Sequence, residues 1–139
     1  MQDFSKKIVI VVNRDLPFWQ VLNTVAHISA FIGNKMDAPF DTGSSFLTNE
    51  GKEHPRNSQF PIIVLSAKPG QMVNIMAKVR SSGLLYLGFI REMIETTDDA
   101  EIVQLLSQKN DGQIEYLGVG VFGENEQVDA ITKNYSLWK

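Results

Sequence analysis

The chain has 139 residues, of which 43% are hydrophobic and 21% charged, and its net charge at pH 7 is −3. This length and composition predict a single globular domain, residues 1–139, with one hydrophobic core. The acidic balance and the scattered positions of the 13 Lys and Arg residues argue against nucleic-acid binding. Since there is no cysteine, and no apolar run long enough for a signal peptide or a membrane span, we expect a cytoplasmic protein without disulfides or membrane contacts.

Two buried strands and a long apolar helix are predicted in the first half of the chain. Lys7–Asn13 is a continuous β-branched run, which is typical of a central strand buried on both faces. Asp15 is the expected N-cap of a helix from about Pro17 to Ile32, which Gly33-Asn34 should end. Phe60–Ser66 predicts the second strand.

The segment between these strands, residues 37–58, is polar and interrupted by glycine and proline. At most it holds a short edge strand near Ser45–Thr48, and we expect a mobile flap over the carboxyl edge of the sheet. His54 lies near Asp41, Glu50 and Glu53, but without the ligand spacing of known metal motifs. No metal site and no cofactor are therefore predicted.

Strands and helices alternate in the second half of the chain, which indicates a layered α/β domain. Its first three strands should be parallel through right-handed crossovers. The predicted elements are a helix from Pro69-Gly70 to about Ser82, a strand at Leu84–Ile90, a helix from Thr97 to about Gln108, a strand at Gln113–Phe122, a short helix at Asn125–Thr132 and a docked apolar tail at Tyr135–Trp138.

Both ends of the chain resemble the type II peptidyl-tRNA hydrolases. Tyr116–Gly123 reads YLGVGVFG and resembles the LGIGP strand of that family, and DAITKNYSLW follows it. In the opening, KIVIVVNRDLP, Asp15 and Leu16 match the family's Asp-Leu turn, while His27 matches its histidine. In FIREMI, Arg91 matches the family's arginine and Glu92 stands at its catalytic aspartate.

Other positions depart from that family. Its functional lysine aligns best with Gln20 or is missing, Thr24 replaces a glutamine, and Glu115 replaces a threonine. The chain looks closer to a bacterial family, the domain-of-unknown-function family two thousand, which shares the type II hydrolase fold. This resemblance implies an α/β three-layer sandwich with a small four-stranded mixed sheet and an antiparallel edge strand. It implies no established activity.

Four polar residues of the first predicted helix form a stripe: Gln20, Asn23, Thr24 and His27 fall on one face at i, i+3, i+4 and i+7. This polar stripe is either the solvated face of the helix or the lining of a cleft. It carries amide, hydroxyl and imidazole groups without Lys or Glu, and solvated faces usually carry charge. Gly118 and Gly120 likewise serve either helix packing or close approach of a ligand.

In open α/β sheets, ligands lie beyond the carboxyl ends of the parallel strands. By that rule, the candidate residues are Asn13, Arg14 and Asp15 after the first strand. Arg91 and Glu92 follow the third strand and are candidates for the same reason. These charged groups either hold loops through ion pairs or belong to a functional site.

Three functions remain open at this point. The first is a small-molecule-binding or regulatory domain without peptidyl-tRNA hydrolase activity, with ligand-binding residues Asn13, Arg14, Gln20, Asn23, Thr24 and Arg91. The second is a hydrolase of amides or esters that uses His27, Asp15 and Glu92 as acid–base groups. The third is a homodimeric interaction module built on an apolar surface around Phe18-Trp19.

Overall fold

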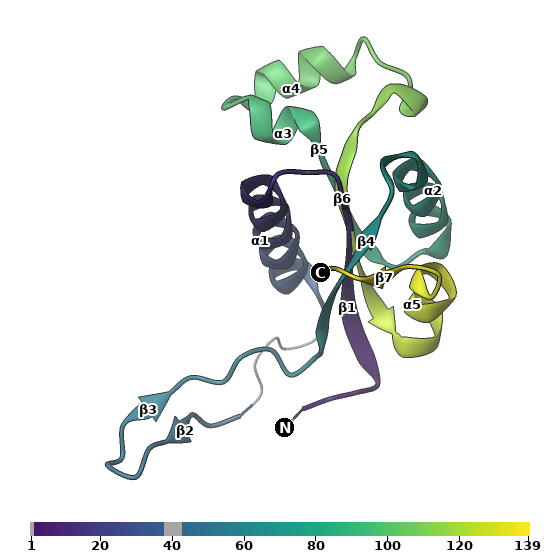
Figure 1. The fold of residues 1–139 in the computed structure, drawn as a ribbon. Helices are drawn as coiled ribbons and strands as arrows, with labels where there is room; N and C mark the ends of the chain where they lie inside the picture. Colours follow the sequence, from purple (N-terminus) through teal and green to yellow (C-terminus); the bar gives the residue numbers. More distant parts are fainter. Residues whose placement is uncertain (1, 38–42) are drawn as a thin grey trace.

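The computed structural model describes residues 2–37 and 43–139 and is built around a five-stranded mixed sheet (Figure 1). The strand order is β5-β6-β1-β4-β7. β1 pairs in parallel with β4 and antiparallel with β6, while β5 pairs antiparallel with β6 and β7 antiparallel with β4. Strands β1, β4 and β5 therefore point the same way. Their bounds are β1 (Lys6–Asn13), β4 (Ile62–Ala67), β5 (Leu85–Ile90), β6 (Tyr116–Glu124) and β7 (Ser136–Leu137).

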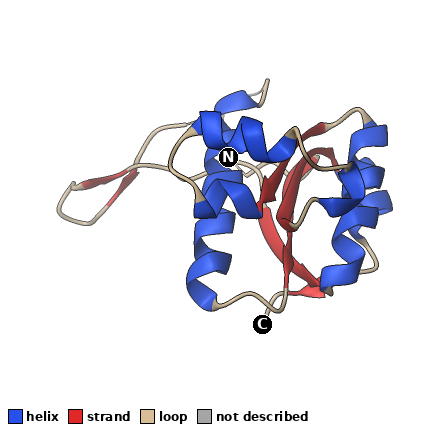
Figure 2. Cartoon of the chain, turned by 90° about the horizontal axis from the view of Figure 1, so that it is seen from above, coloured by secondary structure: helices blue, strands red, loops and turns tan. Residues whose placement is uncertain are grey.

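Helices cover both faces of this sheet (Figures 1 and 2). Helix α1 (Phe18–Lys35) lies on one face, and α2 (Met72–Ser82) and α5 (Asn125–Thr132) lie on the other. The side chains of β1 alternate between the two cores, because successive residues of a strand point to opposite faces. Ile8, Ile10 and Val12 pack on the α1 side, and Val9 and Val11 pack on the side of α2 and α5.

Two short helices, α3 (Arg91–Glu95) and α4 (Asp99–Leu106), lie beyond the carboxyl end of β5 (Figure 1). Short 3₁₀ turns at Pro69–Gln71 and Asp111–Gln113 precede α2 and β6 respectively. No helix in the described ranges is long and apolar enough to span a bilayer.

Two glycines of β6 let α1 approach the sheet closely. A Cβ atom at Gly118 would lie 2.5 Å from Thr24 Cγ2, and one at Gly120 would overlap the side chain of Ile28. Of the two roles considered for these glycines, the structure supports helix packing.

The sheet differs from the expected four-stranded one in two respects. It has a fifth strand, β7, formed by the tail that was expected only to dock, because this segment pairs with the outer edge of β4 at Leu65 and Ser66. The first three main strands do run in the same direction, but antiparallel β6 separates β5 from β1. Residues Tyr116–Gly123 are all buried, which suits a strand with neighbours on both sides and helices on both faces.

Helix boundaries also differ from the predictions. α1 continues through Gly33-Asn34 to Lys35, since the backbone N–H of Met36 still donates to Ile32 O. Asp15 is not its N-cap: Pro17 occupies that position, and no side chain caps the helix. The helix expected at 97–108 is shorter, and α3 forms directly after β5, where the backbone N–H of Thr96 donates to Glu92 O at 3.1 Å.

The segment expected to be a flap contains a small hairpin of β2 (Phe46–Leu47) and β3 (Glu53–His54), which pair antiparallel. The predicted edge strand near Ser45–Thr48 therefore exists, but outside the main sheet. The hairpin projects from the amino end of β1 and β4, so its expected place over the carboxyl edge is wrong (Figure 1). The cause is the connection itself, because α1 returns the chain to the amino end before β4 begins. Residues 38–42 of the expected flap, including Asp41, lie outside the described residues.

Candidate functional site

The turn after β1 places two charged side chains at the carboxyl edge of the sheet. Asn13 is buried, and its Oδ1 accepts a 2.9 Å hydrogen bond from the backbone N–H of Asp15. The backbone N–H of Arg14 donates to Ala67 O at 3.0 Å, which ties the turn to the end of β4. Arg14 and Asp15 project outward, with Arg14 Nε 3.9 Å from Asp15 Oδ1. Asn13 therefore holds the turn, and Arg14 and Asp15 remain accessible.

These two residues border a hollow of about 410 Å³, which we call the carboxyl-edge crevice. Its size is within the range of about 300–1,000 Å³ of small-molecule sites. Trp138 forms part of the wall, held by a 3.0 Å hydrogen bond from its backbone N–H to Val64 O and by edge-on packing against Phe18 at 5.9 Å. The crevice combines cations, hydroxyls and an indole ring. Its lining residues are Arg14, Asp15, Leu16, Phe18, Ser66, Ser136, Leu137, Trp138 and Lys139.

A second group of predicted residues meets at the guanidinium of Arg91. Arg91 Nε and Nη2 donate to the two carboxylate oxygens of Glu115 at 3.1 and 2.8 Å, and Nη1 donates to Gln20 Oε1 at 2.9 Å. The hydrogen bond from Arg91 holds the pKa of Glu115 below its ordinary value, although partial burial opposes this. The same hydrogen bond raises the pKa of Arg91. We call this closed arrangement of Gln20, Arg91 and Glu115 the arginine fork.

The polar stripe of α1 does not line one continuous cleft. Thr24 is fully buried against β6, and its Oγ1 has no hydrogen-bond partner among the described residues. His27 is exposed and stacks on Phe89 of β5, with ring centroids 5.1 Å apart and planes inclined by 14°. Asn23 is half-buried. The stripe is thus divided: Gln20 belongs to the arginine fork, Thr24 packs on β6, and His27 stacks on β5.

The partner of Glu92 lies just after α4 in the chain. Glu92 is 4% exposed, and its Oε1 pairs with Lys109 Nζ, while Oε2 has no partner in the described part of the chain. Burial is the largest single influence on the pKa of Glu92 and raises it, but the hydrogen bond from Lys109, a backbone hydrogen bond and the charge of Lys109 together outweigh burial, so the pKa lies below its ordinary value. Within residues 2–37 and 43–139, no hydrogen bond or ion pair links His27, Asp15 and Glu92 to one another.

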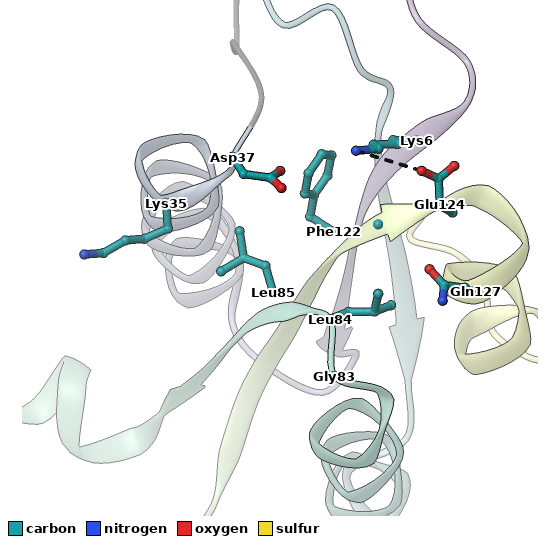
Figure 3. Close-up of a pocket in the computed structure, with 10 residues that line it drawn as sticks. Lys6, Lys35, Asp37, Gly83, Leu84, Leu85, Phe122, Glu124 and Gln127 are labelled. Carbon is teal, nitrogen blue, oxygen red and sulfur yellow. Dashed lines mark ion pairs between the residues drawn. The ribbon is translucent and has the colours of Figure 1, made fainter.

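A different hollow of about 410 Å³ lies at the amino end of the sheet (Figure 3). There Lys6 Nζ is 3.9 Å from Glu124 Oε1 and 5.9 Å from the centroid of Phe122, and Asp37 approaches from the end of α1. This end is opposite to the edge where open α/β sheets bind ligands. No group of three or more His, Asp or Glu that could hold a metal ion occurs in the described ranges.

Several residues of these sites carry no recognisable signal in the sequence. Ser66 and Ser136 are ordinary serines, and they meet only because β7 pairs with β4. Trp138 belongs to a tail that was expected to dock, but its docking partner was not predicted. Lys109 reaches Glu92 through the placement of α4, which local sequence does not determine.

A family model described as "Protein of unknown function (DUF2000)" matches residues 6–139. The chain belongs to this family. The DUF2000 match confirms the second of the two resemblances drawn from the sequence. No curated protein matches the chain. A solved structure, the protein of unknown function Atu0240 from Agrobacterium tumefaciens strain C58, is 24% identical with a TM-score of 0.82, covering 97% of this chain and 98% of that one. At this identity the likeness shows the fold alone.

Proposed function

We propose that this DUF2000 protein binds a small organic anion in the carboxyl-edge crevice and has a ligand-binding or regulatory role. The observation that carries the proposal is the crevice itself, which lies where the parallel strands β1 and β4 end. Arg14 and Lys139 supply positive charge, and Ser66 and Ser136 supply hydroxyl groups. Trp138 supplies a flat apolar wall, so a carboxylate or phosphate attached to a planar or apolar group fits this chemistry.

The first turn of α1 favours the same ligand charge. It contains no acidic residue and no side-chain cap, so its free N–H groups leave the positive end of the helix uncompensated. Phe18, the first residue of α1, lines the crevice. Asp15 opposes the binding of an anion, because its carboxylate lies 3.9 Å from Arg14 and competes for the guanidinium. An incoming anion has to displace this exposed pair, which is weak in water.

We further propose that the fold is that of the type II peptidyl-tRNA hydrolases and that the hydrolase activity is absent. The arginine fork supports the second part. Glu115 stands at the hydrolase family's threonine position, and Gln20 aligns best with its lysine unless that lysine is missing; both accept hydrogen bonds from Arg91. Three of the guanidinium N–H groups are thereby occupied, and the family's lysine ammonium and threonine hydroxyl have no counterpart here. A hydrolase that uses His27, Asp15 and Glu92 would additionally require Glu92 to leave Lys109.

The ligand proposal is tested by thermal-shift measurements with a panel of aromatic and aliphatic carboxylates and phosphates. A ligand at 100 times its Kd stabilises by about 2.7 kcal/mol, which raises the melting temperature of a chain of this size by roughly 8–10 °C. Arg14→Ala should abolish the shift. The matched control is Arg80→Ala, since Arg80 lies on α2 on the other face of the sheet. A shift that survives Arg14→Ala, or no shift with any anion, would refute the crevice as the binding site.

A further inference from the structure

Helix α1 exposes large apolar side chains on its outer face. Phe18 is 74% exposed, Trp19 60% and Leu22 70%. From Leu16 to Asn34 the sequence contains no Asp, Glu, Lys or Arg. Solvent-facing helix surfaces normally carry charge, and a cluster of exposed aromatic and aliphatic side chains is typical of an interaction surface.

The outer face of α1 is bulky at one end and smooth at the other. Positions 18, 22, 26 and 30 are four residues apart and form one ridge along the helix. Phe18 and Leu22 are large, whereas Ala26 and Ala30 are small, and all four are exposed. Such a surface is complementary to its own copy when the two helices run in opposite directions, because each bulky end then lies over a smooth end.

We propose that a second copy of this chain binds here, through antiparallel packing of α1 on α1 about a twofold axis. In this arrangement Leu22 packs on the partner's Ala26 and Phe18 on the partner's Ala30. A twofold axis repeats each contact, as the isologous interfaces of most dimers do.

The size and charge of the surface suit a dimer. The exposed parts of Phe18 and Trp19 together offer roughly 250 Å² per copy, and Leu22 and Leu137 enlarge the same apolar area. In two copies the aromatic side chains offer roughly 500 Å², and Leu22 and Leu137 add to this toward a specific interface of about 1,000 Å². An apolar groove of about 610 Å³ lies beside the ridge, lined by Phe18, Val21, Leu22, Val25, Ala26, Val64 and Trp138. Bulky partner side chains can fill it, and the uncharged surface lets two chains of net charge −3 meet without local repulsion.

Sedimentation velocity of the full chain between about 1 and 100 μM tests the proposal. The wild type should sediment as a dimer at the higher concentration. Leu22→Asp should weaken association by at least about 100-fold, because each of the two copies then buries a carboxylate in an apolar contact. Val103→Asp is the matched control, since Val103 is 68% exposed on α4 and the substitution adds the same charge. A monomeric wild type, or equal weakening by both substitutions, would overturn the proposal.

Cross-linking tests the helix direction independently, since the chain has no cysteine of its own. A mixture of the Leu22→Cys and Ala26→Cys variants should form mixed disulfide dimers on mild oxidation, more readily than either variant alone. Val103→Cys mixed with Ala26→Cys provides the background rate. Mixed dimers no more abundant than this background would rule out the antiparallel register. Both substituted positions are exposed, so circular dichroism should show an unchanged fold.

Discussion

The pair formed by Glu92 and Lys109 permits the most specific prediction. Lys109→Met keeps most of the aliphatic stem but removes the charge that faces the buried carboxylate. Leaving a buried ion without its partner typically costs about 3–5 kcal/mol. The side chain of Lys109 is itself 34% exposed, so water screens part of the attraction, and we expect a loss of about 2–3 kcal/mol at pH 7.

The loss should depend on pH in a definite direction. In the wild type the pKa of Glu92 is below its ordinary value of 4.5, so its stabilising contribution is present above that value and disappears as the pH falls through the folded pKa. In Lys109→Met, burial is no longer opposed by Lys109 and raises the pKa of Glu92. Protonation then relieves the variant's penalty as the pH falls, and the stability difference should shrink between about pH 6 and pH 4.

Urea unfolding of both proteins at several pH values measures this difference. Lys78→Met is the control, because Lys78 is exposed on α2 and forms no ion pair with a described residue. In a Glu92→Gln background, Lys109→Met should cost little, since no buried charge is then left unpaired. A difference below about 0.5 kcal/mol at pH 7, or one that stays constant down to pH 4, would refute the reasoning.

Three other predictions follow from the fold and the arginine fork. Gly120→Ala should destabilise by about 1–3 kcal/mol in urea because the added Cβ overlaps Ile28, whereas Gly112→Ala, with open space around it, should stay within about 0.5 kcal/mol; equal effects would contradict the packing role. The purified protein should not release tRNA from peptidyl-tRNA above the buffer rate, and fast release that is lost in His27→Ala would show this to be wrong. Trypsin should cut first after Lys52 in the hairpin, where the side chain is 77% exposed and a two-stranded ribbon is marginally stable; mass spectrometry that finds the first cut in α2 would count against this.

The local sequence pattern was sufficient to predict those features that a single segment determines by itself. The β-branched run of β1 indicates burial on both faces, and the structure confirms this through two separate cores. The rule for carboxyl ends of parallel strands placed Arg14 and Asp15 at an accessible edge, and they border the crevice. The resemblance to the hydrolases singled out Gln20 and Arg91 as candidate site residues, and the structure shows a hydrogen bond between them.

Relations between distant segments were not predictable in the same way. Whether YLGVGVFG enters the sheet beside β1 or at an edge depends on which neighbours it finds, and no local property encodes that choice. The partner of Glu92 depends on the placement of α4, and the crevice depends on β7 reaching β4. The expected N-cap failed for a local reason: α1 begins at Phe18 with Pro17 at the N-cap position, two residues beyond Asp15.

The central place of β6 has a consequence for how the chain folds during synthesis. Among the described strands, β5 pairs only with β6, and β1 keeps one edge open until β6 arrives. In a nascent chain that has not reached Tyr116, β1 and β5 therefore lack the strand that joins them, and unpaired strand edges promote association between chains. We expect the strands to pair in a single late step, after β6 has been synthesised. Polypeptides truncated before β6 should therefore aggregate instead of forming a smaller stable unit.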